Sequence, residues 1–260
     1  MEHINGVFKI INPNKNTYLV VIKINNDTKN SSKYENIFAD FADFSEKMPN
    51  YDKKEYKILH HQTKKQEFLA GRFALLKALE LLEYEYKGIK KDENGKPYLI
   101  DYQENNQQDN NQQGNQENNI HISLTHSYPF ACALASRLGA CGVDIEAPKE
   151  KILRVAPRVF SENECAFLQK DLQKNTVFWC AKEVLYKIYG KGEVNFKENL
   201  FISPFKDETE IKVVAEIKMP DFQQKYVLDV AFLEDFVLCY GVSNCELPQT
   251  RIACEDTSNG

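Results

Sequence analysis

Two short segments of the chain carry side chains that could do chemistry together. The first reads GVDIE and carries Asp144 and Glu146; the second reads WCAKEVLYK and carries Glu183 and Lys187. Carboxylate oxygens are ligands that Mg²⁺ prefers, and a protein-bound Mg²⁺ keeps positions open for water or phosphate oxygens. A lysine ammonium offsets phosphate charge. Together the two segments predict a site for a divalent cation and a phosphate.

Periodicity indicates the elements that must position these side chains. GVDIE is typical of the end of a strand, and because strand side chains alternate, Asp144 and Glu146 point to the same side. WCAKEVLYK is typical of a helix, where Glu183 and Lys187 share a face about one turn apart. No cysteine and histidine spacing in the chain indicates zinc.

The same residues also have a plainer interpretation. Asp144 and Glu146 could end a strand at the surface, and Glu183 could form an exposed ion pair with Lys187. Such a pair stabilises a helix by about 0.3–0.5 kcal/mol. Because D-x-E is a common tripeptide, chemistry alone favours the metal site and the surface charges about equally.

Length and composition bound the class of protein. The 260 residues are 42% hydrophobic and 27% charged, which suits one large domain or two modest ones. The formal net charge is -5, without a strongly basic half, so a nucleic-acid partner is disfavoured. The sequence shows no signal peptide and no apolar run of about 20 residues. Seven scattered cysteines, none in C-x-x-C, indicate a reduced protein. We therefore expect a cytoplasmic protein that does not bind membranes.

The first half of the chain begins with apolar runs at 7–11 and 18–22, which predict two strands. A long helical segment follows over 51–83, with an interruption near 60–63. A glycine turn at Gly95 then precedes a short strand. Residues 103–119 are almost entirely Asn and Gln, with no apolar side chain to bury, which predicts a disordered loop.

The second half alternates strands with two helices. Ser161 and Glu164 fit a capping box, which predicts a helix from Glu162 to about Gln169. A second helix over 174–189 carries Glu183 and ends at glycines. Strands are predicted at 120–127, 130–136, 140–145, 199–202, 210–218, 226–233 and 236–242.

The two parts of the chain share one order of elements. In each, a long helix is followed by a glycine-containing turn and a short strand. Aligning Ala70 with Cys180 sets Phe73 where the second part has Glu183, so only one part could hold a metal. We predict an α+β fold of two similar α+β halves related by a pseudo-two-fold. Each half is a small antiparallel sheet packed with a long helix, and the active site lies at the seam.

The predicted division of the chain follows from this arrangement. The N-terminal half covers 1–138, the C-terminal half covers 139–247, and 248–260 forms a polar, flexible tail.

The motifs resemble those of the 4′-phosphopantetheinyl transferases. GVDIE followed by WCAKEVLYK looks like the signature pair of that family, and their separation fits. The upstream blocks FLAGR, GKPYL and ISLTHS, and the block FSENE between the signatures, are similar to further family blocks in the expected order. The resemblance covers about Lys53 to Phe201. Two halves resemble the larger, surfactin-synthetase-activating type, whereas the holo-acyl-carrier-protein synthase type is a single half that trimerises.

The resemblance implies an activity and a role for each signature residue. The enzyme would move phosphopantetheine from coenzyme A to a serine of an apo acyl or peptidyl carrier protein, releasing adenosine 3′,5′-bisphosphate. Asp144, Glu146 and Glu183 would hold Mg²⁺ on the pyrophosphate. Glu183, or a water that it orients, would deprotonate the serine. Lys187 would stabilise the pyrophosphate and the leaving group.

The resemblance also implies contacts to coenzyme A in the first half. Lys96, Thr125 and His126 would bind the adenosine phosphates, including the 3′-phosphate. Arg72 would help, as Lys182 could by offsetting phosphate charge. The protein would act as a monomer.

A basic run after the metal strand could meet an acidic carrier protein. An equally favoured alternative is a solvated helix face. The run consists of Lys149, Lys151, Arg154 and Arg158.

The chain departs from the family's pattern at three places, and two other functions are disfavoured. The insertion at 103–119 has no familiar counterpart, residues 6–48 do not match well, and Cys180 replaces a more usual serine or threonine. A metal-dependent nuclease is disfavoured, because those sites use E-x-K on a strand, whereas a spacing of four suits a helix. A non-catalytic coenzyme A-binding or carrier-binding protein is disfavoured because the carboxylate set is intact.

Overall fold

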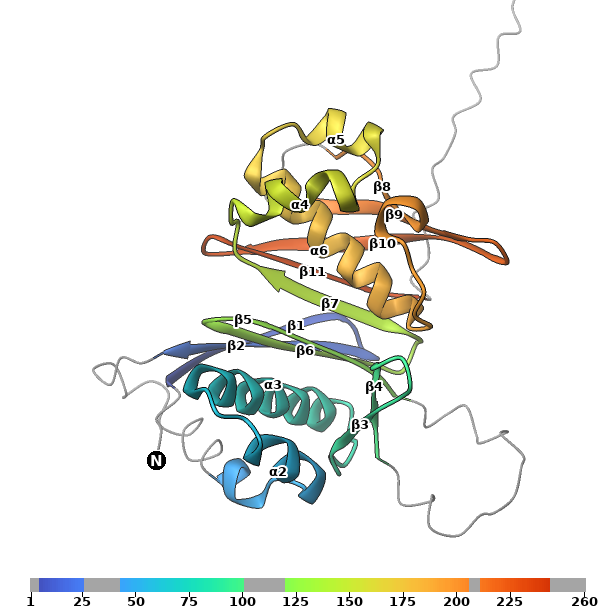
Figure 1. The fold of residues 1–260 in the computed structure, drawn as a ribbon. Helices are drawn as coiled ribbons and strands as arrows, with labels where there is room; N and C mark the ends of the chain where they lie inside the picture. Colours follow the sequence, from blue (N-terminus) through green and yellow to red (C-terminus); the bar gives the residue numbers. More distant parts are fainter. Residues whose placement is uncertain (1–4, 26–42, 101–119, 206–210, 244–260) are drawn as a thin grey trace, which may run out of the picture.

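The computed structural model describes residues 5–25, 43–100, 120–205 and 211–243 (Figure 1). Within them, antiparallel sheets pack with helices, which confirms the predicted α+β class. The predicted disordered loop at 103–119 and the tail at 248–260 lie outside the described residues. No helix of the described ranges combines the length and the apolar character that a membrane span needs.

The first sheet has the strand order β1-β2-β6-β5, and the long helix α3 packs on one of its faces. Helix α2 precedes α3, and β3 with β4 forms a small two-stranded sheet beside them (Figure 1). The bounds are β1 Asn5–Asn14, β2 Thr17–Asn25, α2 Asn50–Lys57, α3 Gln62–Leu81, β3 Ile89–Lys91, β4 Pro97–Leu99, β5 His121–Ser127 and β6 Phe130–Ser136.

The sequence of β6, FACALAS, shows why α3 can lie so close to this sheet. Alternate residues point to opposite faces. The alanines, among them Ala131 and Ala133, belong to the core under α3, while Cys132 and Leu134 belong to the core on the other face. Small side chains on the helix side let α3 approach the strand, because protein interiors pack at crystal-like density.

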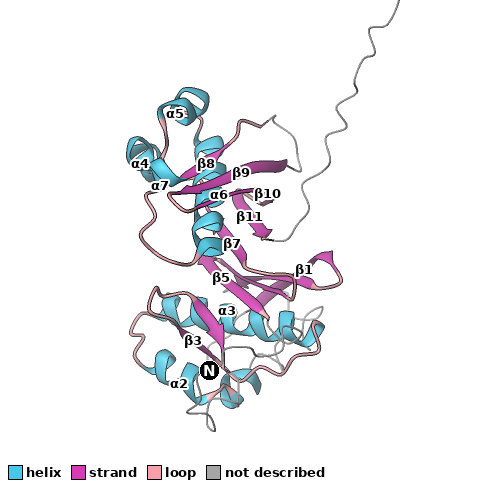
Figure 2. Cartoon of the chain, turned by 90° about the vertical axis from the view of Figure 1, so that its right-hand side faces the viewer, coloured by secondary structure: helices cyan, strands magenta, loops and turns pink. Residues whose placement is uncertain are grey.

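The second sheet has the strand order β7-β11-β10-β9-β8, and α6 crosses one face of it (Figure 2). The short helices α4, α5 and α7 pack around α6 and β8. The bounds are β7 Cys141–Glu146, α4 Lys151–Val159, α5 Glu162–Leu168, α6 Leu172–Tyr189, α7 Phe196–Asn199, β8 Leu200–Ile202, β9 Ile211–Met219, β10 Phe222–Leu233 and β11 Phe236–Val242.

The two sheets share a third core. Leu19 and Leu134 of the first sheet pack with Val143, Ile145 and Leu238 of β7 and β11. The edge strand β5 of the first sheet thereby lies against the edge strand β7 of the second. Each sheet carries its own long helix, as expected; the pseudo-two-fold and the boundary at residue 138 stay predictions.

Gly142 shows how closely β7 and α6 approach each other. A Cβ atom at this position would lie 2.5 Å from the carbonyl oxygen of Val184. Any other residue would therefore push the helix away from the strand. The glycine of GVDIE fixes the distance between the two elements that carry the predicted signature residues.

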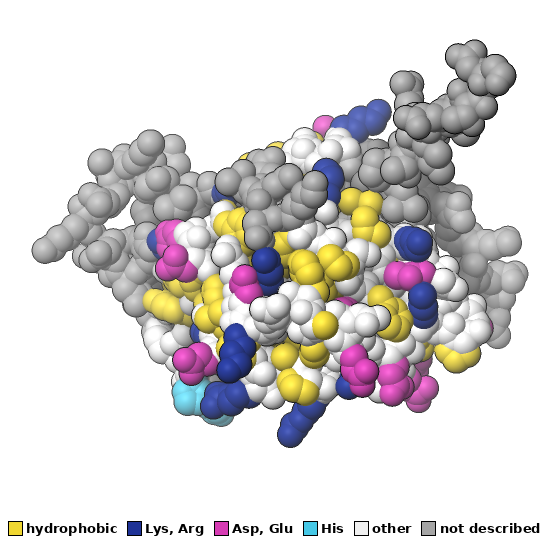
Figure 3. All heavy atoms as spheres, turned by 90° about the horizontal axis from the view of Figure 1, so that it is seen from above, with side chains coloured by type: hydrophobic (Ala, Val, Ile, Leu, Met, Phe, Trp, Pro, Cys, Tyr) yellow, Lys and Arg dark blue, Asp and Glu magenta, His cyan; other side chains and the backbone are white. Residues whose placement is uncertain are grey.

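The surface seen from above in Figure 3 carries both signs of charge. Basic and acidic side chains alternate with hydrophobic ones over the described part of this face. A nucleic-acid-binding surface typically gathers lysines and arginines into one stripe. In the described part of this face the basic side chains are instead dispersed.

Candidate active site

Asp144 and Glu146 lie on the same side of β7 as Gly142, the side that approaches α6. Asp144 is only 5% exposed, and Glu146 and Glu183 are partly buried. The interpretation of Asp144 and Glu146 as charges at the surface end of a strand is therefore wrong. The predicted strand and helix bring the three carboxylates near enough for their charges to affect one another's pKa.

Lys187 connects α6 to β7. Its Nζ donates to the carbonyl oxygen of Val143 and to Oδ1 of Asp144, both at 2.8 Å. The alternative of an exposed pair with Glu183 is wrong, because the ammonium reaches across to the neighbouring strand. The lysine thus sits where it can offset negative charge next to Asp144.

The carboxylate of Asp144 is only half satisfied. Oδ1 accepts from Lys187 and from Oγ1 of Thr125, at 2.9 Å. Oδ2 is the one buried side-chain oxygen or nitrogen in the described residues without a hydrogen-bond partner. Leaving such an atom unpaired costs roughly 1–3 kcal/mol. The Cys180 thiol lies near this carboxylate: burial, and then the charge of Asp144, raises the pKa of the thiol. A thiol is only a weak hydrogen-bond donor, so it offers Asp144 little compensation.

Asp144, Glu146 and Glu183 offer the oxygen donors that Mg²⁺ takes, although their side chains do not converge on one point. In the described ranges no three His, Cys, Asp or Glu side chains are arranged closely enough to hold a metal ion. Carboxylates of like charge repel one another when no cation lies between them. The unpaired Oδ2 and a donor set made only of carboxylates are the chemistry that Mg²⁺ requires.

The carboxylates lie near enough to influence one another's protonation. Burial, and then the charge of Asp144, raises the pKa of Glu183 to about 7, against the opposing effect of Lys187. Burial and Asp144 also raise the pKa of Glu146, while a hydrogen bond from Ser127 lowers it. A carboxyl group with a pKa near neutrality can accept a proton at physiological pH.

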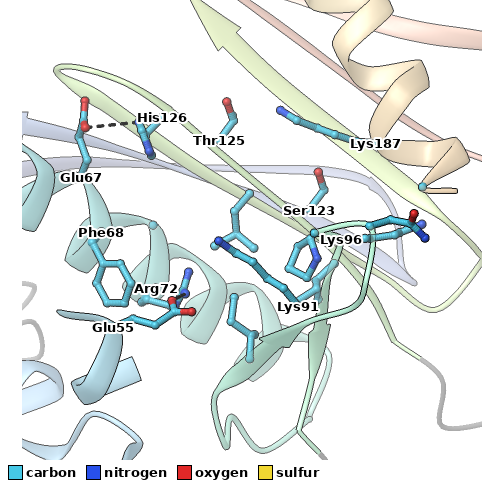
Figure 4. A pocket seen from close by; sticks show the side chains of 18 of the residues that line it. Glu55, Glu67, Phe68, Arg72, Lys91, Lys96, Ser123, Thr125, His126 and Lys187 are labelled. Carbon is cyan, nitrogen blue, oxygen red and sulfur yellow. Dashed lines mark hydrogen bonds and ion pairs between the residues drawn. The ribbon is translucent and has the colours of Figure 1, made fainter. Parts of the chain in front are cut away.

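A cavity of about 510 Å³ opens beside the carboxylates, between the two halves (Figure 4). Its walls come from α3, the turn between β3 and β4, β5 and the end of α6. One part of the wall is apolar, including Phe68, Ile89 and Leu124. Its basic side chains are Lys64, Arg72, Lys91, Lys96, His126 and Lys187, against two acidic ones, Glu55 and Glu67. The cavity therefore suits an anion with a flat apolar part.

Lys96 lies where the two halves meet. Its Nζ donates to the carbonyl oxygen of Ile188 at 3.4 Å, near the C-terminal end of α6. Gly190 ends that helix in the left-handed region, and a Cβ there would lie 2.6 Å from the Lys96 Nζ. The glycine thus serves as helix cap and makes room for the lysine.

His126 projects from β5 at one end of the cavity, where it meets a buried acid (Figure 4). Its Nδ1 lies 3.4 Å from Oε2 of Glu67, which also accepts from Nζ of Lys64 at 2.7 Å. Glu67 was not predicted as a site residue. The sequence offered only an acid directly before FLAGR and three residues after a lysine; that Glu67 is 4% exposed is seen only in the structure.

Arg72 borders the cavity but already has two acidic partners. Its Nε donates to Asp52 at 3.0 Å, and its Nη2 donates to Glu55 at 2.8 Å. The guanidinium also lies 4.4 Å from the ring centroid of Phe68. Arg72 therefore joins α2 to α3 and shapes the wall of the cavity.

Residues 140–240, which contain both carboxylate-bearing elements, match the family model of the 4′-phosphopantetheinyl transferase superfamily. This stretch is similar to members of that superfamily. The match confirms the resemblance that the motifs indicate, at the level of the superfamily. The surfactin-synthetase-activating type stays a prediction.

A curated 4′-phosphopantetheinyl transferase is similar over part of its length. The 4′-phosphopantetheinyl transferase gsp of Aneurinibacillus migulanus is 30% identical over 109 residues. These residues span 40% of this chain and 38% of that protein. The superfamily match covers β7 through most of β11, so the contribution of the first half rests on the cavity geometry.

Lys182, expected to contact coenzyme A, instead has a structural position in the second half of the chain. Its side chain is fully buried, and its Nζ donates at 2.8 Å to Glu164, to the carbonyl oxygen of Val159 and to that of Phe196. An ammonium has three protons, and all three are used here. The expectation that Lys182 binds coenzyme A is therefore wrong.

We predict that Glu183 makes the protein's stability fall as the pH rises. Its folded-state pKa of about 7 exceeds the ordinary 4.5, so between these values the folded protein keeps a proton that the unfolded chain has released. This stabilisation is present below pH 4.5 and is lost toward pH 7. After allowance for partial exposure, it amounts to about 1–3 kcal/mol.

Urea unfolding in EDTA tests this prediction. The wild type should lose more stability between about pH 5 and pH 8 than Glu183→Gln, which cannot ionise. Parallel stability profiles for the two proteins would show that Glu183 titrates normally.

Proposed function

We propose that this protein transfers 4′-phosphopantetheine from coenzyme A to a serine of an apo carrier protein. The observation that carries the proposal is that Lys187 belongs both to the cavity wall and to the group of carboxylates. The lysine lines the basic cavity and also donates to Asp144, so an anion in the cavity would lie beside the carboxylates. The match of residues 140–240 to the superfamily model supports the reaction class.

The cavity supplies the groups that would bind coenzyme A. Lys96 and His126 would contact the adenosine phosphates, with the apolar wall around Phe68 beside the adenine. Asp144, Glu146 and Glu183 would hold Mg²⁺, which when bound polarises the pyrophosphate and stabilises charge on the leaving group.

The chain's own residues then serve the transfer. Glu183, or a water that it orients, accepts the proton of the carrier serine hydroxyl. The serine oxygen forms a bond to the phosphorus next to the pantetheine, and the bond from that phosphorus to the bridging oxygen breaks. Adenosine 3′,5′-bisphosphate leaves, and Lys187 offsets the charge that develops.

The basic run expected to meet the carrier lies beside this site. Lys151, Arg154 and Arg158 are exposed on α4 at spacings of three and four, which place them on one helix face. Lys149 is exposed just before the helix. We propose that this face meets an acidic carrier surface, with an interaction that weakens at high salt.

Loss of a basic group from the cavity should weaken coenzyme A binding. Lys96→Met and His126→Gln each remove a charge-assisted hydrogen bond, worth about 1.5–3 kcal/mol, and should raise the dissociation constant about 10–100-fold. Calorimetric titration with coenzyme A and 3′-dephospho-coenzyme A measures the effect. His126→Gln should reduce the difference in affinity between coenzyme A and 3′-dephospho-coenzyme A.

Lys57→Met is the matched control, because Lys57 is exposed on α2 and does not line the cavity. Its affinity should equal that of the wild type. Equal affinities for Lys96→Met and the wild type would remove the cavity from the proposed site.

The proposal as a whole is tested by incubation with coenzyme A, Mg²⁺ and apo carrier proteins of fatty-acid, polyketide and peptide synthesis. At least one carrier should gain the mass of phosphopantetheine. A protein that binds coenzyme A tightly but modifies none of these carriers would instead fit the non-catalytic alternative.

A further inference from the structure

Three hydroxyl side chains alternate along β5, on the strand that borders the second half. Ser123, Thr125 and Ser127 are two residues apart, so they project from one face of the strand. The side chains of Ile122 and Leu124, on the opposite face of β5, belong to the core under α3. The hydroxyl face of β5 is the face that meets β7.

Each hydroxyl contacts β7. Thr125 donates to Oδ1 of Asp144 at 2.9 Å, and Ser127 donates to Oε2 of Glu146 at 3.1 Å. Ser123 instead accepts from the backbone N–H of Val143 at 3.1 Å. The first two hydroxyls therefore hold carboxylates, whereas the third holds the strand itself.

The position of these contacts matters because β5 and β7 belong to different sheets. Side-chain hydroxyls of the first half reach the carboxylates of the second across this boundary. Ser127 is 8% exposed, so its bond to Glu146 is shielded from water. A hydroxyl has a single proton and engages one oxygen of a carboxylate, which leaves the other oxygen available to a further partner.

We propose that Thr125 and Ser127 are positioning residues, through which the first half of the chain holds Asp144 and Glu146 in place for a divalent cation. The inference rests on the proposed function and adds to it. Ser127 had no predicted role, and Thr125, predicted to bind coenzyme A, both lines the cavity and donates to Asp144. Groups that hold metal ligands in this way set the affinity of the site, and their loss typically costs 10–100-fold in metal affinity.

The test is the affinity for Mn²⁺, an ion visible by electron paramagnetic resonance, measured without carrier protein so that no turnover occurs. Ser127→Ala and Thr125→Val should each weaken Mn²⁺ binding about 10–100-fold relative to the wild type. Ser127→Thr should restore it, because threonine keeps the hydroxyl. Ser127→Cys, with a weaker donor of similar size, should fall between.

Ser123→Ala is the matched control from the same strand face. It removes the partner of a buried backbone N–H and should lower the melting temperature, yet leave Mn²⁺ affinity unchanged. Melting curves of all variants separate loss of fold from loss of positioning. If Ser127→Ala does not fold, the Mn²⁺ affinities of Ser127→Cys and Ser127→Thr are compared instead.

The outcomes separate this inference from the function beneath it. Wild-type protein that does not bind Mn²⁺ would overturn the proposed cation site, and the positioning role with it. Wild-type protein that binds Mn²⁺ while folded Ser127→Ala and Thr125→Val bind it equally well would overturn the positioning role alone.

Discussion

Glu183→Gln is expected to reduce phosphopantetheine transfer by at least about 10³-fold. A positioned general base contributes about 10²–10⁴-fold, and the substitution also removes one oxygen ligand from the proposed cation site. Glutamine keeps the size of the side chain but cannot accept the serine proton. Because the Glu183 side chain on α6 is only partly buried, the protein should still fold when it is replaced by glutamine. Initial rates at saturating coenzyme A measure the effect.

The control for this variant is Glu162→Gln, which changes an exposed acid in the first turn of α5. Its transfer rate should match that of the wild type. Calorimetry should show that Glu183→Gln still binds coenzyme A, since Glu183 does not line the cavity. A Glu183→Gln protein with more than about one tenth of wild-type activity would contradict its role as the base.

Lys182→Met is expected to destabilise the fold by about 3–5 kcal/mol, although it neighbours the proposed base. The ammonium holds Glu164 and two backbone carbonyls, one from α4 and one from α7. Glu164 in turn accepts from the N–H groups of Ser161 and Ile202. Removal of the lysine leaves a buried carboxylate without its counter-ion. Urea unfolding measures the loss.

An exposed lysine provides the comparison for this stability effect. Lys170→Met, just after α5, should unfold at the same urea concentration as the wild type. Lys187→Met should mainly lower the rate of transfer, whereas Lys182→Met should mainly lower the stability of the fold. Wild-type stability of Lys182→Met would contradict the structural role assigned to this lysine.

Local rules account for the elements that the sequence predicted. The strand of GVDIE and the helix of WCAKEVLYK follow from side-chain periods of two and 3.6, and both are confirmed. The capping box at Ser161 and the left-handed cap at Gly190 are confirmed for the same reason, since each needs only neighbouring residues. A helix where α4 lies was indicated only by the alternative of a solvated helix face for the basic run, and Pro157 falls inside that helix.

The partners of the site residues could not be predicted, because they depend on contacts distant in sequence. Lys187 and Glu183 share a helix, yet Lys187 pairs with Asp144 on the neighbouring strand. Lys182 is one residue from Glu183, yet a change of about 100° around the helix turns it into the core. The bond between Thr125 and Asp144 depends on how two separate sheets meet, which no local pattern encodes.

The most direct test of the proposed function is the stoichiometry of one transfer reaction. Wild-type protein, coenzyme A, Mg²⁺ and an apo carrier protein are incubated, and the carrier is analysed by intact-mass spectrometry alongside the released nucleotide. We expect one phosphopantetheine group per carrier, an equal amount of adenosine 3′,5′-bisphosphate, and neither product with a carrier whose acceptor serine is replaced by alanine. Unmodified carriers from all three pathways, together with intact coenzyme A, would contradict the proposed function.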